Sequence, residues 1–129
     1  MRRAAGAFLE ISFIALMLIV LWPQAARPSD RPPECPKRYC GCALSLDLFG
    51  AARPQLFLAA NWLRFPKTAP APGMVAARKG HVMKLIYHVN GSNWQVLDPN
   101  SGKGLTRVHV RSIIGFVVVN PYHRSVLGG

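Results

Sequence analysis

The chain has 129 residues, enough for one small domain and too few for several. Its 16 lysines and arginines against five acidic residues give a formal charge of +11 at pH 7, which draws a protein to anionic polymers or simply keeps its surface soluble. Specific nucleic-acid binding is not expected, because charge alone favours it and the sequence contains no recognisable nucleic-acid-binding module.

Residues 1–26 are expected to form an export signal or a membrane anchor. Two arginines precede an uninterrupted apolar run over 13–22, which is too short to span a bilayer comfortably and so favours a signal. The residues after it make a poor cleavage site, so an uncleaved anchor is the alternative. The rest of the chain is then periplasmic or secreted, or attached to the inner membrane if the segment is retained.

The remainder divides into a tether, one domain and a tail. Residues 27–37 are rich in proline and charge, which predicts an extended tether. The folded domain is expected over 38–120, and the tail over 121–129.

Within the domain, two helices should precede a set of strands. The first helix is predicted at 41–49, ended by Gly50, and the second at 54–64, where apolar residues recur at helical spacing. After Gly73 the pattern becomes alternating, which is typical of strands. Strands are expected at 74–77, 81–89, 93–98, 105–110 and 115–119, with turns at Lys79-Gly80 and Asn90-Gly91. The fold class is therefore α+β, with two N-terminal helices packed on an antiparallel meander of about five strands.

The register of the Asn90-Gly91 hairpin bears on function. If the turn has two residues, Tyr87 pairs with Trp94, and the match of two aromatic rings favours this register. At the other end of the hairpin, His81 then lies diagonal to Asp98 and opposite Asn100. A turn longer by one residue would move Asp98 to the other face.

The three cysteines, Cys35, Cys40 and Cys42, lie within eight residues of one another. A sulfur at the start of a helix is stabilised as thiolate by unpaired backbone N–H groups, which makes Cys40 the candidate nucleophile. A Cys35–Cys42 disulfide would leave Cys40 free, whereas a Cys35–Cys40 disulfide would remove it. Three thiols with a histidine could also hold zinc, although the spacing is unusual and no metal is expected.

The two helices must cover the core-facing side of the sheet, which would bring Cys40 to the edge where His81 begins a strand. A histidine that takes the thiol proton, oriented by Asp98 or Asn100, is the general arrangement of a cysteine nucleophile. Backbone N–H groups at Cys40 and Gly41 would stabilise an oxyanion. The residues thus predict a Cys-His-Asp/Asn site.

Several short motifs, in order and spacing, resemble the papain-like NlpC and CHAP hydrolases, in their small exported branch. They are Tyr39-Cys40-Gly41-Cys42 before a helix, Asn61-Trp62 in the second helix, Gly73-Met74-Val75-Ala76-Ala77 running into Gly80-His81-Val82, and Val96-Leu97-Asp98-Pro99-Asn100-Ser101-Gly102. The chain departs from the pattern at Met83, where a glycine is usual, and at Cys42, where an aromatic residue is often found.

The resemblance implies a nucleophile at Cys40, a base at His81 and an orienting group at Asp98 or Asn100, without a cofactor. The implied substrates are peptide or amide bonds of bacterial peptidoglycan. Two alternatives remain open. One is a domain of the same fold that has lost activity and binds anionic wall polymer; the other is an envelope protein that uses its cysteines for disulfides or metal.

Four further residues are candidates for binding the substrate. The ring of Tyr39 is a candidate for lining the cleft. Arg107, His109 and Arg111 alternate on one face of a predicted strand, which is typical of a solvated face, and their other interpretation is that they hold an anionic substrate.

Overall fold

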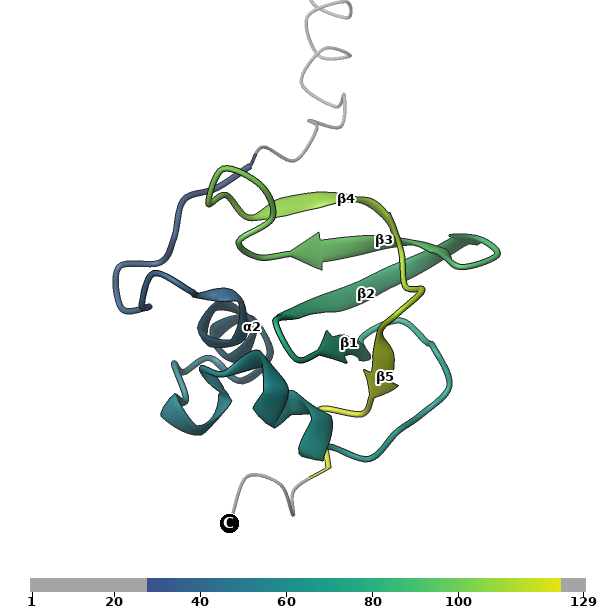
Figure 1. Ribbon diagram of the computed structural model, residues 1–129, viewed down its shortest axis with the longest axis horizontal. Coiled ribbons are helices and arrows are strands. Elements are labelled where there is room, and N and C mark those ends of the chain that lie inside the picture. The colour runs from purple at the N-terminus through teal and green to yellow at the C-terminus, as the bar shows by residue number, and fades with distance from the viewer. Residues whose placement is uncertain (1–27, 124–129) are drawn as a thin grey trace, which may run out of the picture.

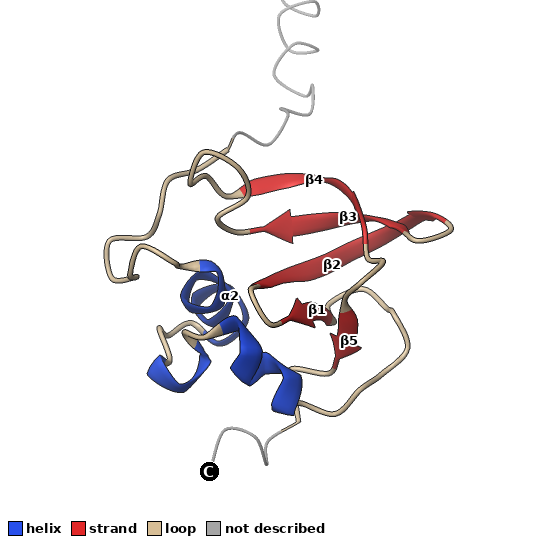
Figure 2. Cartoon of the chain, viewed as in Figure 1, coloured by secondary structure: helices blue, strands red, loops and turns tan. Residues whose placement is uncertain are grey.

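The computed structural model describes residues 28–123, which form a five-stranded antiparallel sheet with helices packed beside it (Figures 1 and 2). Its elements are α2 (Cys40–Phe49), the short 3-10 helices η1 (Pro54–Leu56) and η2 (Ala59–Arg64), and strands β1 (Val75–Arg78), β2 (His81–Asn90), β3 (Asn93–Asp98), β4 (Arg107–Ser112) and β5 (Val117–Val119). The fold class is α+β, as predicted. The expected export signal or anchor at 1–26 and most of the tail lie outside the described residues. Across 28–123, no helix has the length and apolar character to cross a membrane.

The sheet has the strand order β4-β3-β2-β1-β5, so the predicted meander is correct only for its first four strands. After β4 the chain crosses to the opposite edge, where β5 pairs antiparallel with β1 and Val118 lies opposite Ala76. Three consecutive valines suit this place, because β5 contributes Val118 to the apolar cluster on one face and Val119 to the cluster on the other.

Each face of the sheet carries its own apolar core. The helices cover the face of Val82, together with alternate residues of β1 and β5. The face of Met83 and Leu85 is instead closed by Trp94, by neighbouring strands and by the β4–β5 connection. The side of the sheet that the two helices cover is therefore the Val82 face. In β1 and β5, consecutive apolar residues are buried on both faces of the sheet. The alternation of residues within β2 alone therefore did not show which face the helices cover.

The second predicted helix is replaced by η1 and η2. The chain is extended at Leu58, with φ −78° and ψ 124°, which interrupts any continuous α-helix. The break leaves the carbonyl of Leu56 without a helical partner, and the buried indole N–H of Trp62 donates to it at 2.8 Å. That bond satisfies two buried polar groups at once.

The β2–β3 hairpin has the predicted register at one end only. Leu85 lies opposite Val96, as the predicted two-residue turn implies, but Asn90 pairs with Asn93, so the turn lies at Gly91-Ser92 and not at Asn90-Gly91. Trp94 lies opposite His88 and contacts its ring, with centroids 5.0 Å apart. The predicted pairing of Tyr87 with Trp94 is therefore wrong. Two irregularities in β2 shift the register, and together they amount to two residues, so the alternation of faces is preserved where β3 ends.

The proline-rich segment is bound to the domain rather than acting as a free tether. Ser29 forms two backbone hydrogen bonds with Thr106, at 3.0 and 2.8 Å, beside the start of β4. Cys35 is buried and bonded to Cys42 in α2. Residues 29–37 therefore form part of the protein surface around the N-terminus of α2.

Candidate active site

Cys40 is the first residue of α2 and is free. The disulfide joins Cys35 to Cys42, with Cα atoms 5.7 Å apart, which confirms the pairing that spares Cys40. No side chain caps the helix at Tyr39, so first-turn N–H groups remain available near the sulfur. Because two of the three cysteines form this disulfide, the three-thiol zinc site does not fit. Nowhere in 28–123 do three or more His, Cys, Asp or Glu side chains gather in a way that could hold a metal ion.

Gly41 explains how the sulfur is set so close to the second helical segment. A Cβ at this position would lie 2.1 Å from the Leu56 carbonyl oxygen and 2.8 Å from that of Phe57. Only glycine therefore lets the first turn of α2 pack against η1, as the close approach of two backbones requires.

His81 begins β2, directly after the turn at Lys79 and Gly80, and its side chain points to the end of β3. Its Nε2–H donates a hydrogen bond to Asp98 Oδ1. The same imidazole lowers the pKa of the Cys40 thiol, so the sulfur and the ring interact. Because Asp98 holds Nε2, the ring nitrogen left for the sulfur is Nδ1.

The three groups shift one another's pKa. Burial alone would raise the pKa of the Cys40 thiol, but His81 and the backbone N–H groups of Val82 and Gly41 hold it below its usual value. Burial would lower the pKa of His81, yet Asp98 and the sulfur raise it to about 9. The two groups therefore shift each other toward the thiolate and imidazolium forms.

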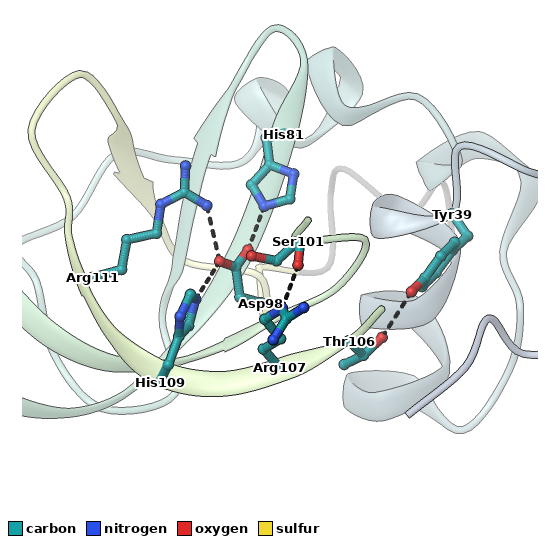
Figure 3. A network of polar contacts seen from close by, with 8 residues as sticks. All are labelled: Tyr39, His81, Asp98, Ser101, Thr106, Arg107, His109 and Arg111. Atoms are coloured by element: carbon teal, nitrogen blue, oxygen red, sulfur yellow. Dashed lines mark hydrogen bonds and ion pairs between the residues drawn. The ribbon is translucent and has the colours of Figure 1, made fainter. Parts of the chain in front are cut away.

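Asp98 is completely buried and binds more than His81 (Figure 3). Its Oδ2 accepts hydrogen bonds from His109 Nε2 at 2.7 Å and from Arg111 Nη1 at 2.9 Å. Burial would raise the pKa of this carboxyl, but the hydrogen bonds from His81, His109, Ser101 and Arg111 hold it far below its usual range. Asp98 is thus an anion at every pH at which the protein is expected to work.

The polar face of β4 is therefore not the solvated face that the sequence suggested. His109 and Arg111 turn toward Asp98, whereas Val108 and Val110 are exposed, Val110 to 51%. The antiparallel pairing of β3 with β4 places these polar side chains on the Asp98 face. The sequence contained a signal for this contact. Among the strands of residues 28–123, Asp98 is the only acidic residue, so basic residues on a neighbouring strand have one carboxylate to bind.

Three further predicted residues occupy different places. Asn100 lies outside the ladder, in the turn after β3, with a left-handed backbone (φ 56°), and it is Asp98 that holds His81. Arg107 donates from Nε to the Ser101 carbonyl at 2.6 Å and so braces that turn. Tyr39 is buried, and its hydroxyl donates to the Gly104 carbonyl at 2.8 Å and accepts from Thr106 at 3.3 Å, which fixes the β3–β4 loop (Figure 3).

Hollows open on both sides of the Cys40–His81 pair and meet at Gly80. The one on the His81 side, about 440 Å³, is lined by Arg78, Gly80, His81, Asn100, Ser101, Gly102, His109 and Arg111. The one on the Cys40 side, about 240 Å³, is lined by Pro36, Arg38, Cys40, Phe57, Leu58, Ala59, Lys79 and Gly80. A third, of about 730 Å³, is lined by Arg31, Lys37, Arg38, Tyr39, Asn100 and Gly104. Met83 is fully buried in the core and lines none of them.

The hollows also contain functional candidates that the sequence did not single out, namely Arg38, Arg78 and Lys79. Each is basic, and none of the three hollows is lined by an acidic residue. The arrangement can carry out nucleophilic attack by sulfur, proton transfer by an oriented imidazole, and attraction of an anionic substrate. In comparisons with known proteins, no family model, no curated protein and no solved structure matches this chain.

Proposed function

We propose that this protein is an exported cysteine hydrolase, with a papain-like domain, that cleaves amide bonds of bacterial peptidoglycan through Cys40. The observation that carries the proposal is the His81 imidazole, which is bound by buried Asp98 and lowers the pKa of the Cys40 thiol at the start of α2. A buried carboxylate that accepts a hydrogen bond from one ring nitrogen fixes the tautomer and the orientation of the imidazole. The other ring nitrogen is then positioned to act as the base for the nucleophile.

The reaction follows from these positions. The Cys40 thiolate attacks the amide carbonyl carbon, and the N–H groups of Cys40 and Gly41 stabilise the oxyanion that forms. His81 donates its Nδ1 proton to the leaving nitrogen as the C–N bond breaks, which leaves an acyl group on sulfur. His81 then takes a proton from water, the hydroxide attacks the thioester, and the carboxylic acid product leaves with the sulfur again free.

The surroundings of the site support a polymer of the cell envelope as substrate. Lysines and arginines line all three hollows, and the chain as a whole is strongly basic. Peptidoglycan stems carry carboxylates that such surfaces attract. The Cys35–Cys42 disulfide suits an oxidising compartment, in line with the expected export.

A second candidate, a catalytically inactive domain that binds anionic wall polymer, is favoured by one observation. The largest of the three hollows, lined by Arg31, Lys37 and Arg38, contains neither Cys40 nor His81. Binding there needs no chemistry at sulfur.

The test uses purified bacterial sacculi and measures the release of new amino groups. The wild-type protein should release them, and Cys40→Ala should not, while Arg64→Ala, a change in η2 that lines none of the hollows, should behave as wild type. Unchanged release by Cys40→Ala would overturn the proposal. Binding of both proteins to sacculi without release of amines would favour the second candidate.

A further inference from the structure

We propose that the hollow beside His81 binds a carboxylate on the leaving-group side of the scissile amide, and that Arg78 is the residue that selects for it. The inference rests on the proposed function. It adds the chemical nature of the amine product, which the proposed function leaves open. The amine released would carry a free carboxylate on the side chain of its first residue.

Phe116 brings two guanidinium groups into this hollow from strands that do not neighbour each other. Arg78 ends β1 and Arg111 belongs to β4, and their Cζ atoms lie 4.5 and 5.4 Å from the centre of the Phe116 ring. The imidazole of His81 meets the same ring edge-on at 6.4 Å. Cation–π contacts of this kind hold the arginine side chains in place while their N–H groups remain available to a ligand.

The charges in the hollow leave room for an anion. Arg111 is bound to Asp98, and the same carboxylate also serves His81 and His109. Within the described part of the chain, Arg78 makes no ion pair, although it lines the same hollow as Arg111. A carboxylate that entered would meet an exposed guanidinium able to bind both its oxygens.

The direction of proton transfer decides which part of the substrate lies there. His81 must protonate the leaving nitrogen, so the amine departs on the side of the imidazole. The acyl group stays on the Cys40 sulfur, beside the hollow lined by Phe57, Leu58 and Ala59. The hollow on the His81 side therefore faces the amine product, and the hollow on the Cys40 side faces the acyl part of the substrate.

The test compares synthetic peptides that differ only in Glu or Gln on the amine side of the cleaved bond. The wild-type protein should cleave the Glu peptide with a kcat/KM at least about tenfold higher, which is the lower end of what one hydrogen bond to a charged group contributes. Arg78→Met should bring the ratio close to one, whereas Arg78→Lys should keep part of it and Arg64→Met all of it. Arg78 is exposed at the end of its strand, so these variants should fold. Equal cleavage of both peptides by the wild type would overturn the inference and leave the hydrolase intact.

A binding measurement separates the two proposals if neither peptide is cleaved. Glutarate, followed through the NMR signals of the His81 ring, should bind saturably to the wild type and not to Arg78→Met, and uncharged glutaramide should bind to neither. Glutarate binding without cleavage would support the anion site and count against the hydrolase. Absence of glutarate binding would overturn the anion site.

Discussion

Arg111 Nη1 lies 2.9 Å from Asp98 Oδ2, on the carboxylate oxygen opposite the one that holds His81. The orienting residue of the candidate site is therefore itself held from two sides, by β2 and by β4. Its charge is shared among several donors, and it cannot rotate away from His81 without breaking the bonds to His109 and Arg111.

Replacing this carboxylate should cost both stability and function. We expect Asp98→Asn to lower the free energy of unfolding by about 3 kcal/mol, because it leaves buried donors without their anion. The matched control is Asp47→Asn, which breaks the half-exposed pair with Lys84 and should cost less than about 1 kcal/mol. Urea titration of both variants measures the difference in unfolding free energy. Equal losses would contradict the conclusion that the Asp98 carboxylate stabilises the buried donors around it.

The effect of Asp98 on stability should depend on pH in a defined window. The pKa of its carboxyl is lowered in the folded state, so its contribution is present above the unfolded value of about 4 and is lost as pH falls toward the folded value. The pKa of His81 is raised to about 9, so its contribution is present below about 6.5 and is lost as pH rises through 9. The gap in unfolding free energy between wild type and Asp98→Asn should therefore be widest between about pH 4 and 6.5. A gap that does not change with pH would contradict the ion pair.

The reactivity of Cys40 should follow the same groups. The rate of iodoacetamide alkylation, located by mass spectrometry, should rise with an apparent pKa below the free-thiol value of about 8.5. In His81→Ala that pKa should rise, because burial remains and the imidazole that offsets it is gone. Hydrolysis should also decline above pH 9, where His81 loses the proton that it must give to the leaving group. An unshifted thiol in the wild type would remove the basis for the nucleophile.

Gly41 should tolerate no side chain. Gly41→Ala places a Cβ against the backbone of η1, which should displace α2 and lower the free energy of unfolding by several kcal/mol. Gly80 offers the comparison, since a Cβ there meets nothing within 4 Å and its φ is not positive. Thermal unfolding of Gly41→Ala and Gly80→Ala should give a large and a small loss. A stable Gly41→Ala with a normally reactive Cys40 would show that the close approach is unnecessary.

The disulfide should stabilise the segment that precedes the nucleophile. The double change Cys35→Ser and Cys42→Ser is expected to cost roughly 2–4 kcal/mol, since it frees a short loop and leaves two hydroxyls in a buried cluster. Tm measured with and without a reductant should fall for the wild type and stay constant for the double variant. If the reductant left the wild type unchanged, residues 28–37 would be held by other contacts.

The sequence by itself determined most of the secondary structure, apart from the second helix, and the approach of His81 to Asp98. Helix, turn and strand signals act over a few neighbouring residues, so α2, β1, β2 and β3 lie close to where the alternation and turn residues placed them. Cys40 begins a helix, and His81 and Asp98 stand at the strand ends that one hairpin joins. The proximity of His81 and Asp98 therefore needed only local structure and one register, whereas the approach of Cys40 also needed the packing of α2 against the sheet.

The tertiary structure decided the rest. The place of β5 beside β1, the face that the helices cover and the two register shifts in β2 depend on pairings between distant segments, and the sequence offers each of them several alternatives of similar local quality. The contacts of His109 and Arg111 with Asp98, and of Arg78 with Phe116, also depend on such pairings between distant segments. A side chain on a strand has its neighbours chosen by the adjacent strands, and only the folded sheet establishes which strands are adjacent.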